Sequence, residues 1–167
     1  MVDFSAETDA NLRRYIPGFE NLRDDERRAI EEFSLLWQVF EARRSETNFK
    51  VQIARKMGWL GGDSDLLIGK TTDSYKYFQD RYAHSDGHQA KLDELIDELG
   101  TNVRPDICRG LVDDAPDGSK LLAQLFICYR LRNNLFHGIK SKYGYEGQLD
   151  NFKHAITFLN AVLSQQG

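Results

Sequence analysis

Apolar residues recur at helical spacing in three long stretches of the chain. Within each stretch they step by three or four residues, so they fall on one face of a helix that buries this face. The pattern predicts long helices over residues 24–44, 118–136 and 147–165. The apolar face of the first helix consists of Ile30, Phe33, Leu36, Trp37 and Phe40.

Shorter apolar periods lie between the first two long stretches and predict additional short helices. A first short helix is capped by Asn48 and contains Phe49, Ile53 and Met57, and a second is capped by Asp73 and contains Tyr75, Phe78 and Tyr82. Two more are expected over residues 91–99 and 104–112. No segment alternates apolar and polar residues over the length of a strand, so no sheet is expected. The predicted fold class is therefore all-α, a helical bundle with additional short helices in the middle of the chain.

The ends and the composition of the chain add little to this fold. Residues 1–21 show no clear period and are expected to form an extended or loosely docked lead-in to a single domain over 1–167. The longest apolar run, 121–129, is too short to span a bilayer, and the acidic N-terminus lacks the features of a signal peptide. We expect a cytoplasmic protein without a membrane segment, with Cys108 and Cys128 as free thiols in the core.

A basic island over residues 119–145 stands out, because the chain as a whole has 22 Lys and Arg against 26 Asp and Glu. The island contains no Asp or Glu, and its basic members are Lys120, Arg130, Arg132, Lys140 and Lys142. A local excess of positive charge on an acidic chain indicates an anion site, for which phosphate is the commonest large ligand. The alternative is a solvated helix end that happens to be cationic.

Helical geometry separates the two arginines of the island. Arg132 lies eleven residues after Leu121, within about 20° of it on a helical wheel, so it falls inside the apolar stripe. Arg130 is predicted to point the opposite way, towards solvent. His137 is followed by Gly138, a common C-terminal stop, and the negative end of the helix dipole favours a protonated imidazole there. Arginine, asparagine and histidine around one helix end make a plausible phosphodiester site.

The segment Arg132-Asn133-Asn134-Leu135-Phe136-His137 resembles the R-x(4–6)-H signature of the HEPN superfamily, in which a polar residue often follows the arginine. The resemblance spans residues 22–166. It implies a dimeric helical bundle that acts as a metal-independent endoribonuclease and needs no cofactor. One branch of the family carries tyrosine two residues after the histidine, as the target of a nucleotidyltransferase antitoxin. This chain has Ile139 at that position, so this form of regulation is not implied.

The resemblance also implies a mechanism. The ribose 2′-hydroxyl attacks the phosphodiester and leaves a 2′,3′-cyclic phosphate and a 5′-hydroxyl. His137 would move protons, Arg132 would stabilise charge on the phosphorane, and Asn133 would hold His137 or a phosphate oxygen. One protomer offers one suitable histidine, so a homodimer is expected to supply both base and acid. The residues expected to position the RNA are Arg130, Lys140, Lys142 and Tyr143.

An RNase of this kind would act in phage defence, in a toxin–antitoxin pair or in RNA turnover, with an antitoxin or regulatory protein as a further partner. A second class of function is a catalytically inactive HEPN-like module for dimerisation or RNA binding. In that case Arg132 would form a structural ion pair with an acid of a neighbouring helix, such as Glu32 or Glu41.

A third class is a metal-dependent hydrolase. His84 and His88 have the spacing of a helical zinc pair, but Gly87 between them favours a loop with surface histidines. Gly69-Lys70-Thr71 imitates the end of a phosphate-binding loop. Because Ser64 stands where that loop requires its first glycine, nucleoside triphosphate hydrolysis is not expected.

Overall fold

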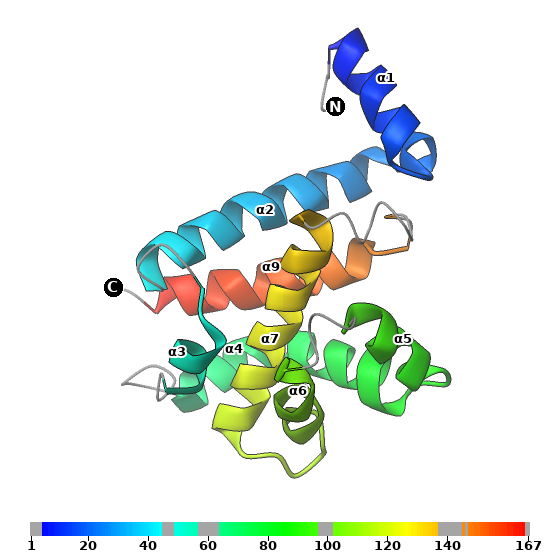
Figure 1. Cartoon of the computed structure of the whole chain (residues 1–167). Helices are drawn as coiled ribbons and strands as arrows, with labels where there is room; N and C mark the ends of the chain where they lie inside the picture. Colours follow the sequence, from blue (N-terminus) through cyan, green and yellow to red (C-terminus); the bar gives the residue numbers. More distant parts are fainter. Residues whose placement is uncertain are drawn as a thin grey trace.

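The computed structural model describes residues 5–44, 49–56, 64–96, 102–136, 145 and 147–165. Within these ranges all regular secondary structure is helical and no strand occurs, which confirms the predicted all-α class (Figure 1). In the same ranges, no helix combines the length and the apolar character needed to cross a membrane.

Three long helices form the frame: α2 (Asp24–Arg44), α7 (Asp117–Phe136) and α9 (Leu149–Ser164). Their bounds agree with the three predicted long helices to within two residues at almost every end. Figure 1 shows α2 and α9 side by side, with α7 running across them. Helices α2 and α9 run parallel (Figure 1). At their starts, the Glu26 carboxylate accepts hydrogen bonds from the backbone N–H of Arg23 (3.0 Å) and from that of Gly147 (3.3 Å). The buried Glu26 side chain therefore ties the starts of both helices together.

The predicted apolar face of α2 forms the centre of the core. Phe33, Trp37 and Phe40 are at most 1% exposed. Phe33 contacts Phe152 of α9, with ring centroids 5.3 Å apart, and Trp37 contacts Tyr129 of α7, with centroids 6.2 Å apart. These aromatic contacts join the three long helices around one core.

Helix α7 is covered on several sides. It packs against α4, α5, α6 and α9, and most residues from Leu121 to Asn134 are buried. The contact with α6 (Arg104–Gly110) is close: a Cβ on Gly110 would collide with the Ser119 carbonyl and would lie 2.5 Å from the Ala123 Cβ. Glycine at position 110 therefore allows the two backbones to approach each other.

The remaining short helices are α3 (Val51–Lys56), α4 (Ser64–Gln79) and α5 (His88–Leu95), with a π-helical turn over Asp80–His84 after α4. The first of these overlaps the helix expected after Asn48, although Asn48 and Met57 lie outside the described residues. The predicted helix over 104–112 corresponds to α6, and the helix predicted over 91–99 begins earlier, at His88.

Helix α4 is longer than the sequence pattern predicts. It begins at Ser64, nine residues before the expected cap Asp73. Its buried side chains, Leu67, Thr71, Ser74 and Phe78, are spaced by three or four residues and hold the segment in a helix. The Gly69-Lys70-Thr71 sequence consequently lies inside a helix, which agrees with its rejection as a phosphate-binding loop.

The N-terminal segment is helical, and the expectation of an extended lead-in was wrong. The hydroxyl of Ser5 accepts a hydrogen bond from the backbone N–H of Thr8 (3.3 Å), which caps α1 (Ala6–Tyr15). A 3₁₀ helix over Phe19–Asn21 follows. Helix α1 projects away from the long helices and buries none of its own residues (Figure 1). The loose docking of residues 1–21 stays a prediction.

The two cysteines are free but occupy different environments. Cys128 lies in the core on α7, where burial raises the pKa of its thiol. Cys108 is exposed on α6, so the expectation that both thiols are buried was wrong for this residue.

Candidate functional site at the end of helix α7

The last turns of α7 carry the arginine and the asparagine of the predicted site. Helix α7 continues to Phe136, so Arg132 and Asn133 lie in its final turns and His137 is the next residue of the chain. His137, Lys140, Lys142 and Tyr143 lie outside the described residues. The geometry of the site is therefore described for Arg132, Asn133 and Arg130.

Arg132 lies at the edge of the core and faces α2. Its side chain keeps 28% of its surface exposed. One terminal nitrogen, Nη1, donates a hydrogen bond to the side-chain oxygen of Asn133 (3.0 Å), and Nη2 lies 3.8 Å from a carboxylate oxygen of Glu41. The guanidinium also lies 5.4 Å from the ring centroid of Phe136. The predicted ion pair with an acid of a neighbouring helix is confirmed for Glu41.

One donor of Arg132 has no partner. Its Nε is buried and makes no hydrogen bond in the described part of the chain. A buried N–H without an acceptor is costly, and an anionic oxygen that reached it would remove this cost. The Arg132 guanidinium is thus incompletely satisfied, although Glu41 and Asn133 hold it in place.

Glu41 connects this arginine to a second segment. While Oε2 faces Arg132, Oε1 accepts a hydrogen bond from the backbone N–H of Phe49 (3.3 Å). The Phe49 ring in turn lies 4.7 Å from that of Tyr129 on α7. Glu41 therefore joins α2, the segment before α3 and α7 beside the candidate site.

Asn133 contacts Arg132 rather than solvent. It is 7% exposed, and its side-chain oxygen is the acceptor for Arg132. The polar residue that follows the motif arginine thus holds the arginine side chain. The predicted contact of Asn133 with His137 or with a phosphate oxygen stays a prediction, because His137 lies outside the described residues.

Arg130 is buried, and the expectation that it points to solvent was wrong. It is 3% exposed, and its Nη2 donates to the side-chain oxygen of Asn134 (3.1 Å). Both Arg130 and Asn134 also donate to the backbone carbonyl of Leu95, at 3.4 and 3.1 Å. Leu95 is the last residue of α5, so these two side chains satisfy a carbonyl at the end of a helix.

The physical reason is that α5 covers the side of α7 opposite Arg132. A helical wheel assumes that one face meets the core and the other meets water, and a helix with neighbours on both sides breaks this assumption. Because the Arg130 guanidinium is buried, it cannot reach RNA, and Arg130 is not proposed as an RNA-positioning residue.

The basic island does not form one surface. Lys120 lies at the start of α7, 3.6 Å from Asp117, and twelve residues of helix place it about 18 Å from Arg132. With Arg130 buried, Arg132 is the arginine of the island that retains exposure among the described residues.

The histidine pair proposed for a metal is not arranged as a metal site. His84 ends the π-helical turn, and its Nε2 lies 3.5 Å from Asp113. His88 Nδ1 lies 3.0 Å from the Ser85 carbonyl. No group of three or more potential ligands comes together in the described ranges. These observations give the metal-dependent hydrolase no support.

His154 lies on α9. Its ring stacks on that of Tyr77, with centroids 4.1 Å apart. Burial lowers the pKa of His154, and the nearby carboxylates of Asp150 and Asp73 act in the opposite direction. The contact with α4 gives this histidine a packing role.

Comparisons of the chain with protein-family models, with curated proteins and with solved structures gave no match. Function is therefore argued from the residues of the site and their chemistry.

Proposed function

We propose that this protein is a metal-independent endoribonuclease whose active site combines the ends of α7 from two copies of the chain. The observation that carries the proposal is the Arg132 guanidinium. It is partly exposed at the end of a helix, it has a donor without an acceptor, and His137 is five residues further along the chain. An arginine fork is well suited to the oxygens of a phosphodiester.

The ion pair with Glu41 is compatible with such a role. At 3.8 Å the two groups are close enough to attract each other but too far apart for a strong hydrogen bond. A phosphate oxygen could take over part of this interaction at the exposed part of the guanidinium. Phe136, which is 53% exposed beside the guanidinium, offers a ring on which a base could stack.

The proposed reaction is an internal transesterification. The ribose 2′-oxygen loses its proton to one imidazole and forms a bond to phosphorus. The bond from phosphorus to the 5′-oxygen breaks, and a second imidazole gives that oxygen a proton. The products are a 2′,3′-cyclic phosphate and a 5′-hydroxyl. Arg132 stabilises the additional negative charge on the phosphorane, which is where such electrostatic interactions contribute most.

Two copies of His137 are required because the reaction uses one base and one acid at the same time. A twofold dimer that brings the two α7 ends together would supply both. Lys140, Lys142 and Tyr143 follow His137 closely in the sequence and are proposed to position the RNA. The setting would be phage defence, a toxin–antitoxin pair or RNA turnover, with an antitoxin or regulatory protein as a further partner.

The direct test is to incubate the recombinant protein with mixed RNA in EDTA and to analyse the ends of the products. We expect 2′,3′-cyclic phosphate and 5′-hydroxyl ends. Arg132→Ala and His137→Ala should each lower the cleavage rate at least about 100-fold while the circular dichroism spectrum stays helical. Arg28→Ala and His84→Ala, at exposed positions on other elements, are the matched controls and should cleave like the wild type. Wild-type cleavage by either site variant would refute the assignment.

RNA affinity tests the positioning residues separately. Binding should weaken as salt increases, and Lys140→Ala should reduce the slope of this dependence by about one. A slope that Lys140→Ala leaves unchanged would remove this lysine from the binding surface.

The Arg132–Glu41 ion pair also favours a second candidate function, a catalytically inactive dimerisation or RNA-binding module. In that case the pair would serve to join α2 to α7. The inactive module predicts that the wild type yields no new RNA ends, even though it dimerises or binds RNA. The end-group experiment therefore distinguishes the two functions.

A further inference from the structure

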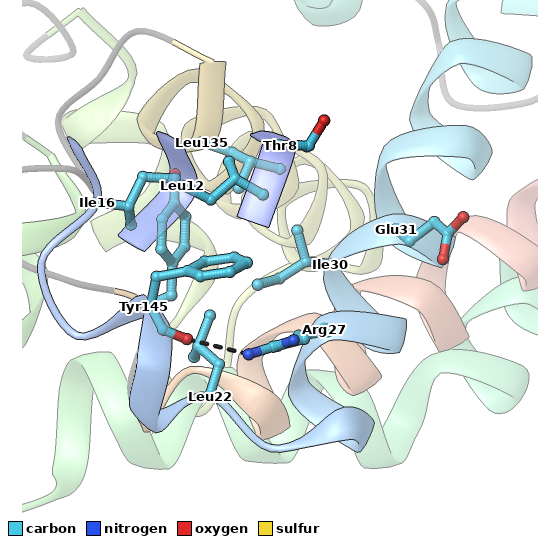
Figure 2. Close-up of a pocket in the computed structure, with 10 residues that line it drawn as sticks. Thr8, Leu12, Ile16, Leu22, Arg27, Ile30, Glu31, Leu135 and Tyr145 are labelled. Carbon is cyan, nitrogen blue, oxygen red and sulfur yellow. Dashed lines mark hydrogen bonds between the residues drawn. The ribbon is translucent and has the colours of Figure 1, made fainter. Parts of the chain in front are cut away.

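An apolar pocket lies between the N-terminal segment and the body of the protein, and no described residue proposed to contact RNA lines it. Its volume is about 400 Å³, within the range of small-molecule sites. Figure 2 shows its side chains converging from α1, α2 and the end of α7, together with Tyr145. The apolar side chains that form its walls are Leu12, Ile16, Phe19, Leu22, Ile30, Leu135 and Tyr145.

Arg27 is the cationic residue at this pocket. Its guanidinium lies 4.6 Å from the ring centroid of Phe19, and its Nη2 donates a hydrogen bond to the Phe19 carbonyl (3.3 Å). Its Nε is covered and has no hydrogen-bond partner within the described ranges. Among the described residues no carboxylate forms an ion pair with Arg27. Arg27 thus provides a positive charge and a free donor beside an apolar cavity.

Glu31 also lines the pocket, one helical turn after Arg27, but it points elsewhere. In Figure 2 its carboxylate is directed away from the apolar side chains, whereas the Arg27 side chain extends towards Leu22. The charged group that a ligand in the cavity would meet is therefore the guanidinium.

The α1 wall of the pocket can move without exposing the main core. Helix α1 buries none of its residues, and it contacts the small apolar cluster through Leu12 and Ile16. A displacement of α1 would thus widen the cavity at low cost, because little apolar area is lost.

We propose that this pocket binds a single-chain anionic amphiphile, with its alkyl chain against the apolar walls and its head group on Arg27. The alkyl chain accounts for the apolar walls, and the anionic head supplies the acceptor that Arg27 lacks. A neutral apolar side chain of another protein would fill the cavity but would leave this donor unsatisfied. The proposal is independent of RNA cleavage.

The test uses the full-length protein and three probes of equal chain length, below their micelle concentrations: decanoate, decyl phosphate and decan-1-ol. Calorimetric titration should show one molecule of each anion bound per chain, with decan-1-ol at least about tenfold weaker. The anion that binds with the higher affinity identifies the preferred head group as carboxylate or phosphate. Equal affinity for the alcohol and the anions, or no saturable binding, would overturn the proposal.

Two pairs of variants assign the binding to this pocket. Arg27→Gln should reduce decanoate affinity about tenfold and leave decan-1-ol unchanged, whereas Arg28→Gln, at the exposed neighbouring position, should have no effect. Leu12→Ser should weaken the binding of all three probes, and Tyr15→Ser, at a position 64% exposed on the same helix, should not. If Leu12→Ser instead lowers the mass in light scattering and decanoate does not bind, the surface belongs to a second copy of the chain and the proposal fails.

Discussion

Arg130 and Arg132 are two residues apart on α7, yet they lie on different faces of the helix and differ in exposure and in hydrogen bonding. Arg130 shares its face with Ala123 and Asn134, is almost fully covered, and completes the hydrogen bonding at the end of α5. Arg132 lies on the face towards α2, keeps part of its surface exposed, and has a donor left over.

The difference shows that an arginine in a basic segment must be judged by which of its hydrogen-bond donors remain without an acceptor. A guanidinium whose donors already bind carbonyl oxygens is part of the scaffold. A guanidinium that lies 3.8 Å from its carboxylate and keeps a donor without an acceptor has capacity left to bind an anion. Substitutions at Gly110, Arg130, Arg132 and Glu41 test this contrast, and a substitution at His154 tests a contact between α9 and α4.

Gly110→Ala should have the largest effect, because it inserts a methyl group where α6 meets the Ala123 face of α7. The new Cβ would collide with the Ser119 carbonyl, so the helices must separate. We expect a loss of about 3 kcal/mol in the free energy of unfolding, measured by urea denaturation. Gly69→Ala is the control, since its Cβ would meet open space inside α4; it should be neutral or stabilising by about 0.5–1 kcal/mol. Equal losses in the two variants would contradict the close contact.

Arg130→Met should have the second largest effect, a loss of about 2–3 kcal/mol in the free energy of unfolding. It removes a donor from the Leu95 carbonyl and leaves the buried Asn134 oxygen without its arginine partner. Arg132→Met should cost at most about 1 kcal/mol, because that side chain is partly exposed and its carboxylate is 3.8 Å away. Urea denaturation of both variants measures the comparison directly. Similar losses would mean that the two faces of α7 do not differ in the way described.

Glu41→Gln should change the free energy of unfolding by less than about 1 kcal/mol. Glutamine keeps an oxygen that can accept from the Phe49 N–H but removes the charge opposite Arg132. If Arg132 binds phosphate, this variant should bind RNA more tightly in a filter-binding assay, because a competing anion has gone. Unchanged or weaker RNA binding, with the fold intact, would favour a structural role for the pair.

His154→Phe should have the smallest effect, and it should depend on pH. Burial lowers the pKa of His154 below its ordinary value of 6.5, so the unfolded chain takes up a proton first as the pH falls. The wild type should therefore lose stability below about pH 6.5, and the phenylalanine variant should lose less. Because the ring is only partly covered, the difference between pH 7.5 and pH 5.5 should stay below about 1 kcal/mol. Parallel stability curves for the two proteins would contradict a lowered pKa.

The long helices could be predicted from the sequence because their apolar positions repeat over more than about four turns. The first half of helix α4 could not, since Gly69 interrupts a short period in which two of the four buried positions of the helix, Thr71 and Ser74, are polar. Helix α1 has a cap and an Asp9–Arg13 pair but no apolar face that is buried, so its pattern is weak. The position of a helix is thus easier to predict than its surroundings.

The candidate site was predictable to the same extent. An arginine in an apolar stripe requires a counter-charge, so the sequence predicts an ion pair for Arg132 and leaves Glu32 and Glu41 as candidates. The structure selects Glu41. The burial of Arg130 depends on where α5 lies, which no local pattern contains. The role of Asn133 as a partner of Arg132 is equally invisible in the sequence, because neighbouring residues on a helix do not normally face each other.

The link between Glu26 and Gly147 has a kinetic consequence. The hydrogen bond joins residues 121 positions apart, so the parallel pair α2 and α9 forms only after almost the whole chain between them has been drawn together. Closing such a long loop costs entropy before any contact compensates for it. Refolding should thus be slow for an all-helical protein of this length.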